Sequence, residues 1–143
     1  MSKECPFKHP LLVRTLFLVL LACGLPSMGR ADNWVNVPQG SAHQVDTDSI
    51  RHSGAFVLAW TRSVYPVPIE LSGEWAYSEK SHLSFNCSKK SQFPLQTITF
   101  ADPDSTVRLH TFSDNPTPNS YQRTDQVNRV ILSFVCKVAS QRQ

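Results

Sequence analysis

Glycine is scarce in this chain, which has five glycines among its 143 residues. Loops that bind phosphate through backbone N–H groups need several glycines close together, and no such cluster occurs here. The sequence also lacks the Gly-x-Ser-x-Gly motif of α/β-hydrolases and any Cys-x-x-Cys pair. These absences favour a protein that is not an enzyme, and we identify no catalytic residue.

The chain lacks an apolar run of the roughly 20 residues that a membrane-spanning helix needs. A shorter apolar run at residues 15–23 follows a basic stretch that contains Lys3, Lys8 and Arg14. This order is typical of a secretory signal peptide, whose apolar centre is too short to cross a membrane. We therefore predict that the protein is exported.

The end of the predicted signal peptide has two readings. Residues 29–31 (GRA) have small side chains at the two positions that a signal peptidase recognises. We therefore predict a signal peptide of residues 1–31 and a single domain of residues 32–143. In the alternative reading, residues 20–24 (LLACG) are a lipoprotein signal, and Cys23 is lipidated and becomes the N-terminus of a membrane-anchored protein.

The predicted domain has no excess charge. Four of the 14 Lys and Arg residues and one of the 11 Asp and Glu residues lie in residues 1–31, which leaves ten of each sign in residues 32–143. Binding of nucleic acid requires a basic face that neutralises phosphate groups. The zero net charge therefore argues against a nucleic-acid partner.

Cysteine is also rare, and only Cys87 and Cys136 follow residue 31. Two cysteines in an exported domain predict a disulfide. Cys87 ends a strand-like segment, and Cys136 lies near the end of a helix-like segment. A bond between them would fix a C-terminal helix onto one face of a sheet, which gives the α+β fold class.

Alternation of apolar and polar residues indicates a mainly β-stranded domain. Residues 55–65 are apolar on both faces, so we place this strand in the middle of the sheet. Residues 46–50 (DTDSI) are predicted to form a turn, because their side chains can bond nearby backbone N–H groups. Residues 66–73 are predicted to form a loop, because proline cannot donate a ladder hydrogen bond. The predicted strands are residues 34–38, 43–46, 55–65, 74–86, 95–101 and 107–112.

A C-terminal helix is predicted from apolar residues that repeat at intervals of three and four. Ser120 or Thr124 would cap its N-terminus. Cys136 lies away from the centre of the apolar stripe, so we expect the helix to loosen near its end and to let the sulfur turn toward the sheet. The stripe consists of Val127, Val130, Ile131, Phe134 and Val138.

Aromatic residues are predicted to fill much of the core. On the strand that leads to Cys87, Trp75 and Tyr77 have the same parity as Leu83 and Phe85. This parity places the Cys87 sulfur on the core face beside Leu83 and Phe85. An exposed tryptophan would instead be an interface candidate. The tryptophans expected in the core are Trp34, Trp60 and Trp75.

Basic residues supply the candidate binding site. Lys89 and Lys90 form a small positive spot beside Cys87. Together with Arg108 and Arg123 they would contact acidic glycans or matrix proteins. In the alternative interpretation, the two lysines only form a solvated turn.

The histidines after residue 31 do not have the spacing of metal ligands on one helix. We therefore predict no metal site and no cofactor. Carriage of haem or a metal by one of these histidines is the alternative. The four residues are His43, His52, His82 and His110.

Five short motifs follow one another along the domain: WVNV at residues 34–37, VDTDSI at 45–50, AWT at 59–61, FNC at 85–87 and FVCK at 134–137. This ordered set resembles the surface-adhesin protein E family of Gram-negative envelope proteins. The resemblance covers nearly all of the domain. It implies an antiparallel sheet of about six strands, with the C-terminal helix tethered to one face by a disulfide.

The resemblance also implies a function. It implies export to the periplasm or the outer-membrane surface, and non-enzymatic binding of host extracellular-matrix proteins or of another envelope protein. Contact with a membrane would come only through a lipid on Cys23. A periplasmic structural protein, or a haem or metal carrier, is the alternative.

Overall fold

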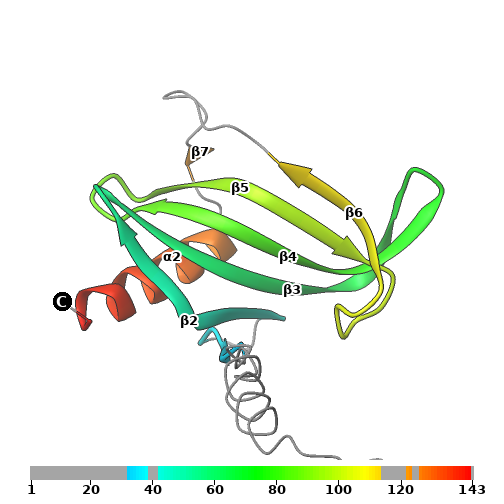
Figure 1. Cartoon of the computed structure of the whole chain (residues 1–143), viewed down its shortest axis with the longest axis horizontal. Helices are drawn as coiled ribbons and strands as arrows, with labels where there is room; N and C mark the ends of the chain where they lie inside the picture. Colours follow the sequence, from blue (N-terminus) through cyan, green and yellow to red (C-terminus); the bar gives the residue numbers. More distant parts are fainter. Residues whose placement is uncertain (1–31, 39–41, 114–121, 124–125, 143) are drawn as a thin grey trace, which may run out of the picture. The chain divides into compact units, whose positions relative to one another are not determined.

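The computed structural model describes residues 32–38, 42–113, 122–123 and 126–142, which form an antiparallel sheet and one helix (Figure 1). Strands β1 to β6 lie side by side in chain order, and the short β7 pairs with β5. The predicted α+β class, with about six antiparallel strands and a C-terminal helix, is confirmed. The elements are β1 (Trp34–Asn36), β2 (His43–Ser53), β3 (Phe56–Leu71), β4 (Glu74–Asn86), β5 (Ser91–Phe100), β6 (Arg108–Ser113), β7 (Gln122–Arg123) and α2 (Gln126–Ser140).

Strand β3 is third in the order of six, as its two apolar faces predict. It turns into β4 through Ser72 and Gly73, whose φ angles are both positive, 53° and 85°. A two-residue turn of this kind matches the right-handed twist of paired strands, and glycine adopts such angles without steric cost. β3 and β4 therefore form one long hairpin.

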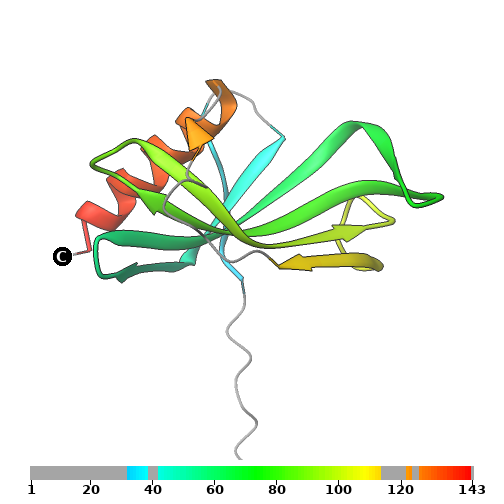
Figure 2. The same cartoon turned by 90° about the horizontal axis from the view of Figure 1, so that it is seen from above.

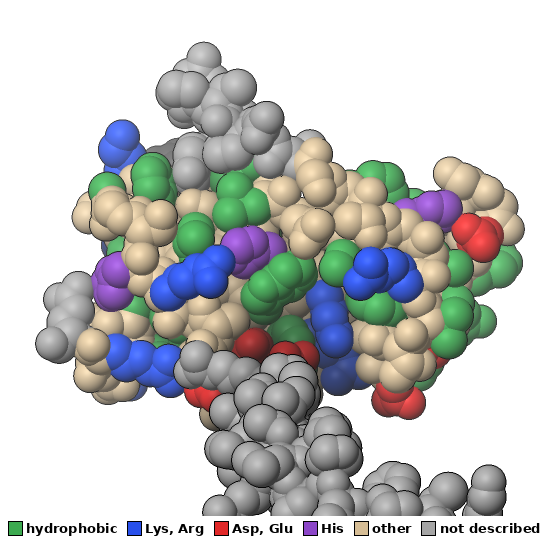
Figure 3. Space-filling view, viewed as in Figure 1, with side chains coloured by type: hydrophobic (Ala, Val, Ile, Leu, Met, Phe, Trp, Pro, Cys, Tyr) green, Lys and Arg blue, Asp and Glu red, His purple; other side chains and the backbone are tan. Residues whose placement is uncertain are grey.

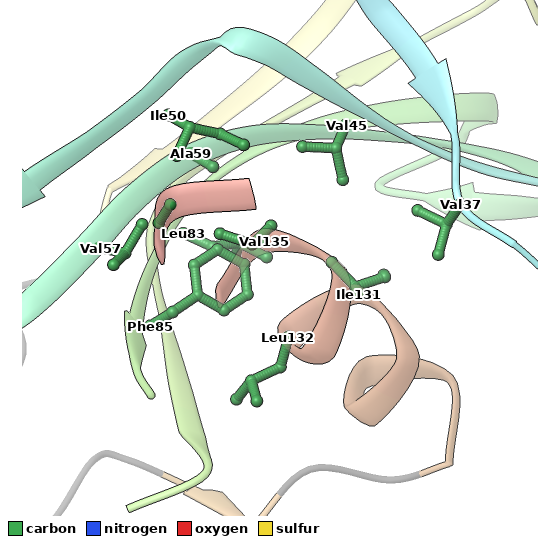
Figure 4. Packing of buried hydrophobic residues seen from close by; sticks show 11 residues of the cluster. Val37, Val45, Ile50, Val57, Ala59, Leu83, Phe85, Ile131, Leu132 and Val135 are labelled. Atoms are coloured by element: carbon green, nitrogen blue, oxygen red, sulfur yellow. The ribbon is translucent and has the colours of Figure 1, made fainter. Parts of the chain in front are cut away.

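The core lies between α2 and one face of the sheet, mainly over β2 and β3 (Figure 4). Phe85 from β4 and Val135 from α2 are fully buried and lie close together at its centre. Full burial of an apolar side chain of this size contributes about 1.5–3 kcal/mol. The cluster consists of Val37, Val45, Ile50, Val57, Ala59, Leu83, Phe85, Ile131, Leu132, Val135 and Ala139.

The buried face of α2 differs from the predicted stripe. Ile131, Leu132, Val135 and Ala139 are its most buried residues. Val130, Phe134 and Val138 are only partly buried, at the flank of the core. The centre of the face is thus rotated toward Cys136, which lies four residues after Leu132. The helix continues to Ser140, so the expected loosening before Cys136 is wrong. The predicted caps Ser120 and Thr124 lie outside the described residues.

A disulfide joins the end of β4 to α2, as predicted. Cys87 and Cys136 are 49 residues apart in the sequence, and their Cα atoms are 5.8 Å apart. Closing a loop of this length removes unfolded-state entropy worth about 4 kcal/mol in the chain-entropy model. The tether therefore contributes a large share of the roughly 5–15 kcal/mol by which a small domain is stable.

The predicted turn at residues 46–50 is wrong, because this segment belongs to β2. The pairing of β2 with β3 shifts in register between Asp46 and Arg51. Oδ1 of Asp46 accepts a hydrogen bond from the backbone N–H of Asp48, and Oγ of Ser49 accepts one from the backbone N–H of Trp60. The side chains do bond the backbone as expected, but they hold a bulge within a strand.

The predicted loop at residues 66–73 is also wrong, because β3 continues to Leu71. The pairing of β3 with β4 shifts in register between Val64 and Ile69. Pro66 and Pro68 lie inside this irregular segment, where no ladder hydrogen bond is required of them. The bulge explains how one strand can contain two prolines.

Candidate interaction surface

The end of the β3–β4 hairpin extends beyond the other strands (Figures 1 and 2). The ladder between β2 and β3 ends at Ser63, and the ladder between β4 and β5 begins at Ser78. Residues 65–77, which we call the ribbon, therefore pair only with each other in the described sheet. A two-stranded ribbon has little core of its own, so its side chains are available for contact with a partner.

Large apolar side chains are exposed on the ribbon. The exposed fractions are 72% for Val67, 39% for Ile69, 55% for Trp75 and 40% for Tyr77. Hydrophobic side chains are visible at this end of the domain in Figure 3. Exposed apolar side chains that share a face, as Trp75 and Tyr77 do on β4, mark interaction sites on soluble proteins, because leaving them in water is unfavourable. The ribbon is thus the candidate interaction surface.

Two features show how the ribbon could make contact. Trp75 and Tyr77 lie on one face of β4, because alternate residues of a strand point to the same side. Pro66 and Pro68 lack the N–H groups that a docking strand would need along this part of β3. These features favour contact through side chains over the addition of a strand to the β3 edge.

Trp75 was predicted to lie in the core, and this prediction is wrong, because its side chain is 55% exposed. Trp75 and Tyr77 have the same parity on β4 as Leu83 and Phe85. The core cluster beneath α2 includes Leu83 and Phe85 but no residue of the ribbon. Because Trp75 is exposed, it is the tryptophan that qualifies as an interface candidate. A sequence signal was present in the prolines at alternate positions 66 and 68, which suit an edge strand.

The other two tryptophans are half-buried and have partners. Nζ of Lys80 lies 5.4 Å from the centre of the Trp34 ring and 5.7 Å from that of Phe100. The rings of Trp60 and His82 are stacked, with their centres 5.0 Å apart and an angle of 16° between their planes. Such contacts of cations and rings stabilise the sheet face opposite α2.

The predicted basic site is divided by the fold. Lys89 and Lys90 are exposed in the turn between β4 and β5, where Oδ1 of Asn86 accepts a hydrogen bond from the backbone N–H of Lys89. Arg108 pairs with Phe100 at the other end of β5. A ten-residue strand separates these ends by about 30 Å. The three residues therefore do not form one site, although β7 brings the backbone of Arg123 beside Ser91, next to Lys90.

Arg62 lies on the face opposite α2, and its guanidinium group forms hydrogen bonds within the domain. It donates hydrogen bonds to Oγ of Ser105 and to the carbonyl of Pro103, at 3.1 and 2.6 Å. Asp102 accepts bonds from the backbone N–H groups of Thr106 and Val107. Although burial alone raises the pKa of the Asp102 carboxyl, these hydrogen bonds outweigh it and lower the pKa below its usual value. These contacts fix the loop between β5 and β6.

The four histidines lie at separate places. Nδ1 of His43 is 2.6 Å from Oγ of Ser63, and Nε2 of His110 is 3.1 Å from Oε2 of Glu74. His52 lies near the carbonyl of Ala139. Within residues 32–38, 42–113, 122–123 and 126–142, no three His, Cys, Asp or Glu side chains are placed to hold a metal ion.

The predicted signal peptide, its cleavage site and Cys23 lie outside the described residues. Among the residues that are described, no helix is long and apolar enough to cross a membrane.

A family model described as Surface-adhesin protein E matches residues 34–137, and the chain belongs to this family. No curated protein matches the chain. Crystal form II of Haemophilus influenzae protein E has a similar structure, with a TM-score of 0.56 and 15% identity over 80% of this chain and 94% of that chain. The selenomethionine form of the same protein gives a TM-score of 0.52 and 14% identity over 80% and 92%.

The structural likeness at these identities concerns the fold. Membership in the family supports a surface adhesin and implies an exported, surface-exposed protein. The resemblance noted in the sequence is therefore confirmed at the level of family and fold.

Proposed function

We propose that this protein is a non-enzymatic adhesin of the outer-membrane surface that binds a host extracellular-matrix protein through its ribbon. The observation that carries the proposal is the exposure of Val67, Ile69, Trp75 and Tyr77 on a hairpin that extends beyond the sheet. Membership in the surface-adhesin family supports the binding role.

The ribbon suits a docking role for energetic reasons. Aromatic side chains such as Trp75 and Tyr77 supply large contact areas and lose little conformational entropy on binding. The backbone that carries them belongs to β4, which pairs with β3 at Trp75, Ala76 and Ser78, so binding requires little ordering of the chain. Attachment to the surface would come from a lipid on Cys23, or from a partner if the chain is cleaved after Ala31.

The test is binding of the exported protein to a panel of immobilised extracellular-matrix proteins. Trp75→Ala combined with Tyr77→Ala is expected to weaken binding by about tenfold or more, because aromatic anchors at interfaces cost about 2 kcal/mol or more when truncated. The same variant should unfold at nearly the parental temperature, since both side chains are exposed.

A matched control is Phe112→Ala. Phe112 is also an exposed aromatic residue, with half of its surface accessible, but it lies on β6 and outside the ribbon. Its loss should leave binding within about twofold of the parent. Absence of binding to every matrix protein would contradict the proposed function, and an equal loss in both variants would contradict the role of the ribbon.

A further inference from the structure

A groove with a volume of about 970 Å³ runs along one flank of α2. Arg129, Ser133 and Lys137 line it, and all three are exposed. They are spaced four residues apart, so they form one row along the helix. The groove thus has a polar side that carries a positive charge at two points.

The other side of the groove is apolar. Val130, Phe134 and Val138 form a second row with the same four-residue spacing, and Pro38 lies beside it. The three α2 residues are only partly buried against the core, so part of each side chain faces the groove. Two neighbouring rows of this kind create the type of furrow into which the side-chain ridge of another helix packs.

Among the residues that the structure describes, no carboxylate pairs with the positive charges of the groove. α2 contains no Asp or Glu. Neither Arg129 nor Lys137 forms a salt bridge within the described part of the chain. An occupant with carboxylates would supply the missing charges, and the apolar row would bury its hydrophobic side chains.

The placement of the charges determines the class of occupant. Arg129 and Lys137 are eight residues apart, about 12 Å along the helix, and both flank the apolar row. A single lipid carries its charge at one end and would meet only one of them. A flat membrane surface would not reach apolar side chains inside a hollow. Residues 1–31 have an excess of Lys and Arg and would be repelled.

We propose that the groove binds an acidic amphipathic helix of a protein partner. Its apolar side chains would pack against Val130, Phe134 and Val138, and its carboxylates would pair with Arg129 and Lys137. Helix-in-groove binding of this kind depends on side chains repeated every three to four residues. This surface and its partner are separate from the ribbon.

The test measures binding of a fluorescent peptide of about 18 residues, with Leu and Glu on adjacent faces of a helix and Ala elsewhere. The exported protein should bind this peptide and not a scrambled peptide of the same composition. Arg129→Glu combined with Lys137→Glu should weaken binding at least about tenfold, because two attractive pairs become repulsive. Ser133→Trp should also weaken binding by filling the groove without a change of charge.

The matched control is Arg51→Glu combined with Lys89→Glu, which makes the same change in net charge at exposed positions outside the groove. This control should bind as the parent does. Equal binding of the scrambled peptide, or an equal loss in the control, would overturn the proposal. Binding of phosphatidylglycerol vesicles that is lost in the Arg129/Lys137 variant, without peptide binding, would also overturn it in favour of a lipid surface.

Discussion

Trp75 and Phe85 show how differently two aromatic residues on one face of one strand can be used. Phe85 is fully buried under α2, whereas more than half of Trp75 is exposed on the ribbon. Strand alternation gives both residues the same orientation. Whether the side chain becomes core or contact surface depends on what lies above it, and α2 covers only one end of the hairpin.

His82 is the residue for which the structure predicts a dependence on pH. It is half-buried and stacked on Trp60. Burial, and to a smaller extent the positive charge of Arg51, lowers the pKa of His82 below its ordinary value of 6.5. The folded protein therefore binds this proton less readily than the unfolded chain does.

The sign of the effect follows from linkage. Protonation favours the unfolded chain, so the contribution of His82 to stability is retained above about pH 6.5 and declines as the pH falls below it. His82→Phe keeps a ring beside Trp60 and removes the titration. Its urea midpoint should change less than the parental midpoint between about pH 7.5 and pH 5. If the urea midpoint of His82→Phe changes between the two pH values by as much as the parental midpoint does, this explanation is contradicted.

At the scale of elements, β3 and α2 each follow their sequence pattern with one local adjustment. β3 keeps its strand geometry through two prolines because the bulge removes them from the ladder. α2 keeps its helical geometry through Cys136 because the whole buried face is rotated. In both cases the tertiary contacts leave the element intact. The bulge accommodates the prolines within β3, and the rotated buried face brings Cys136 to the sheet without an end to the helix.

The disulfide between β4 and α2 is expected to control the stability of the helix on the sheet. Cys87→Ser combined with Cys136→Ser should lower the free energy of unfolding by about 4 kcal/mol, because the unfolded chain regains the entropy of a long loop. Denaturant unfolding with and without a reductant measures this difference. The reductant should destabilise the parent and leave the double variant unchanged. A loss well below about 1 kcal/mol in the double variant would show that the tether is not needed.

At the scale of the whole molecule, the sheet, the core and the disulfide all lie within residues 32–143. The ribbon and the groove of α2 are on different elements of this domain. The two proposals therefore assign separate contact surfaces to one domain: the ribbon to a host protein and the groove to an acidic helix of a protein partner.

The intact mass of the protein exported from a Gram-negative host tests how the chain is processed. We expect a chain that begins at Asp32, with a mass two hydrogens below the reduced value because of the Cys87–Cys136 bond. A chain that begins at an acylated Cys23 would contradict cleavage after Ala31 and would anchor the adhesin by a lipid. Two free thiols would contradict the tether.

Much of the fold follows from local sequence alone. Period-two alternation predicted most strands, and the motifs that include Cys87 and Cys136 indicated the family and the tethered helix. Such patterns are readable because each strand or helix repeats its own geometry. The bulges at Asp46 and at Pro66 were not predicted, because a shift in register depends on the partner strand and not on the residues of one segment.

The sequence by itself determined the class of elements, their order and the cysteine pair. Only the tertiary structure decided that Lys89 and Lys90 are separated from Arg108, that Trp75 is exposed, and that Arg129 and Lys137 flank a groove. The physical reason is that exposure and charge pairing depend on which distant residues become neighbours. A hairpin that extends past its neighbouring strands leaves its aromatic residues in solvent, although their local pattern is that of a core.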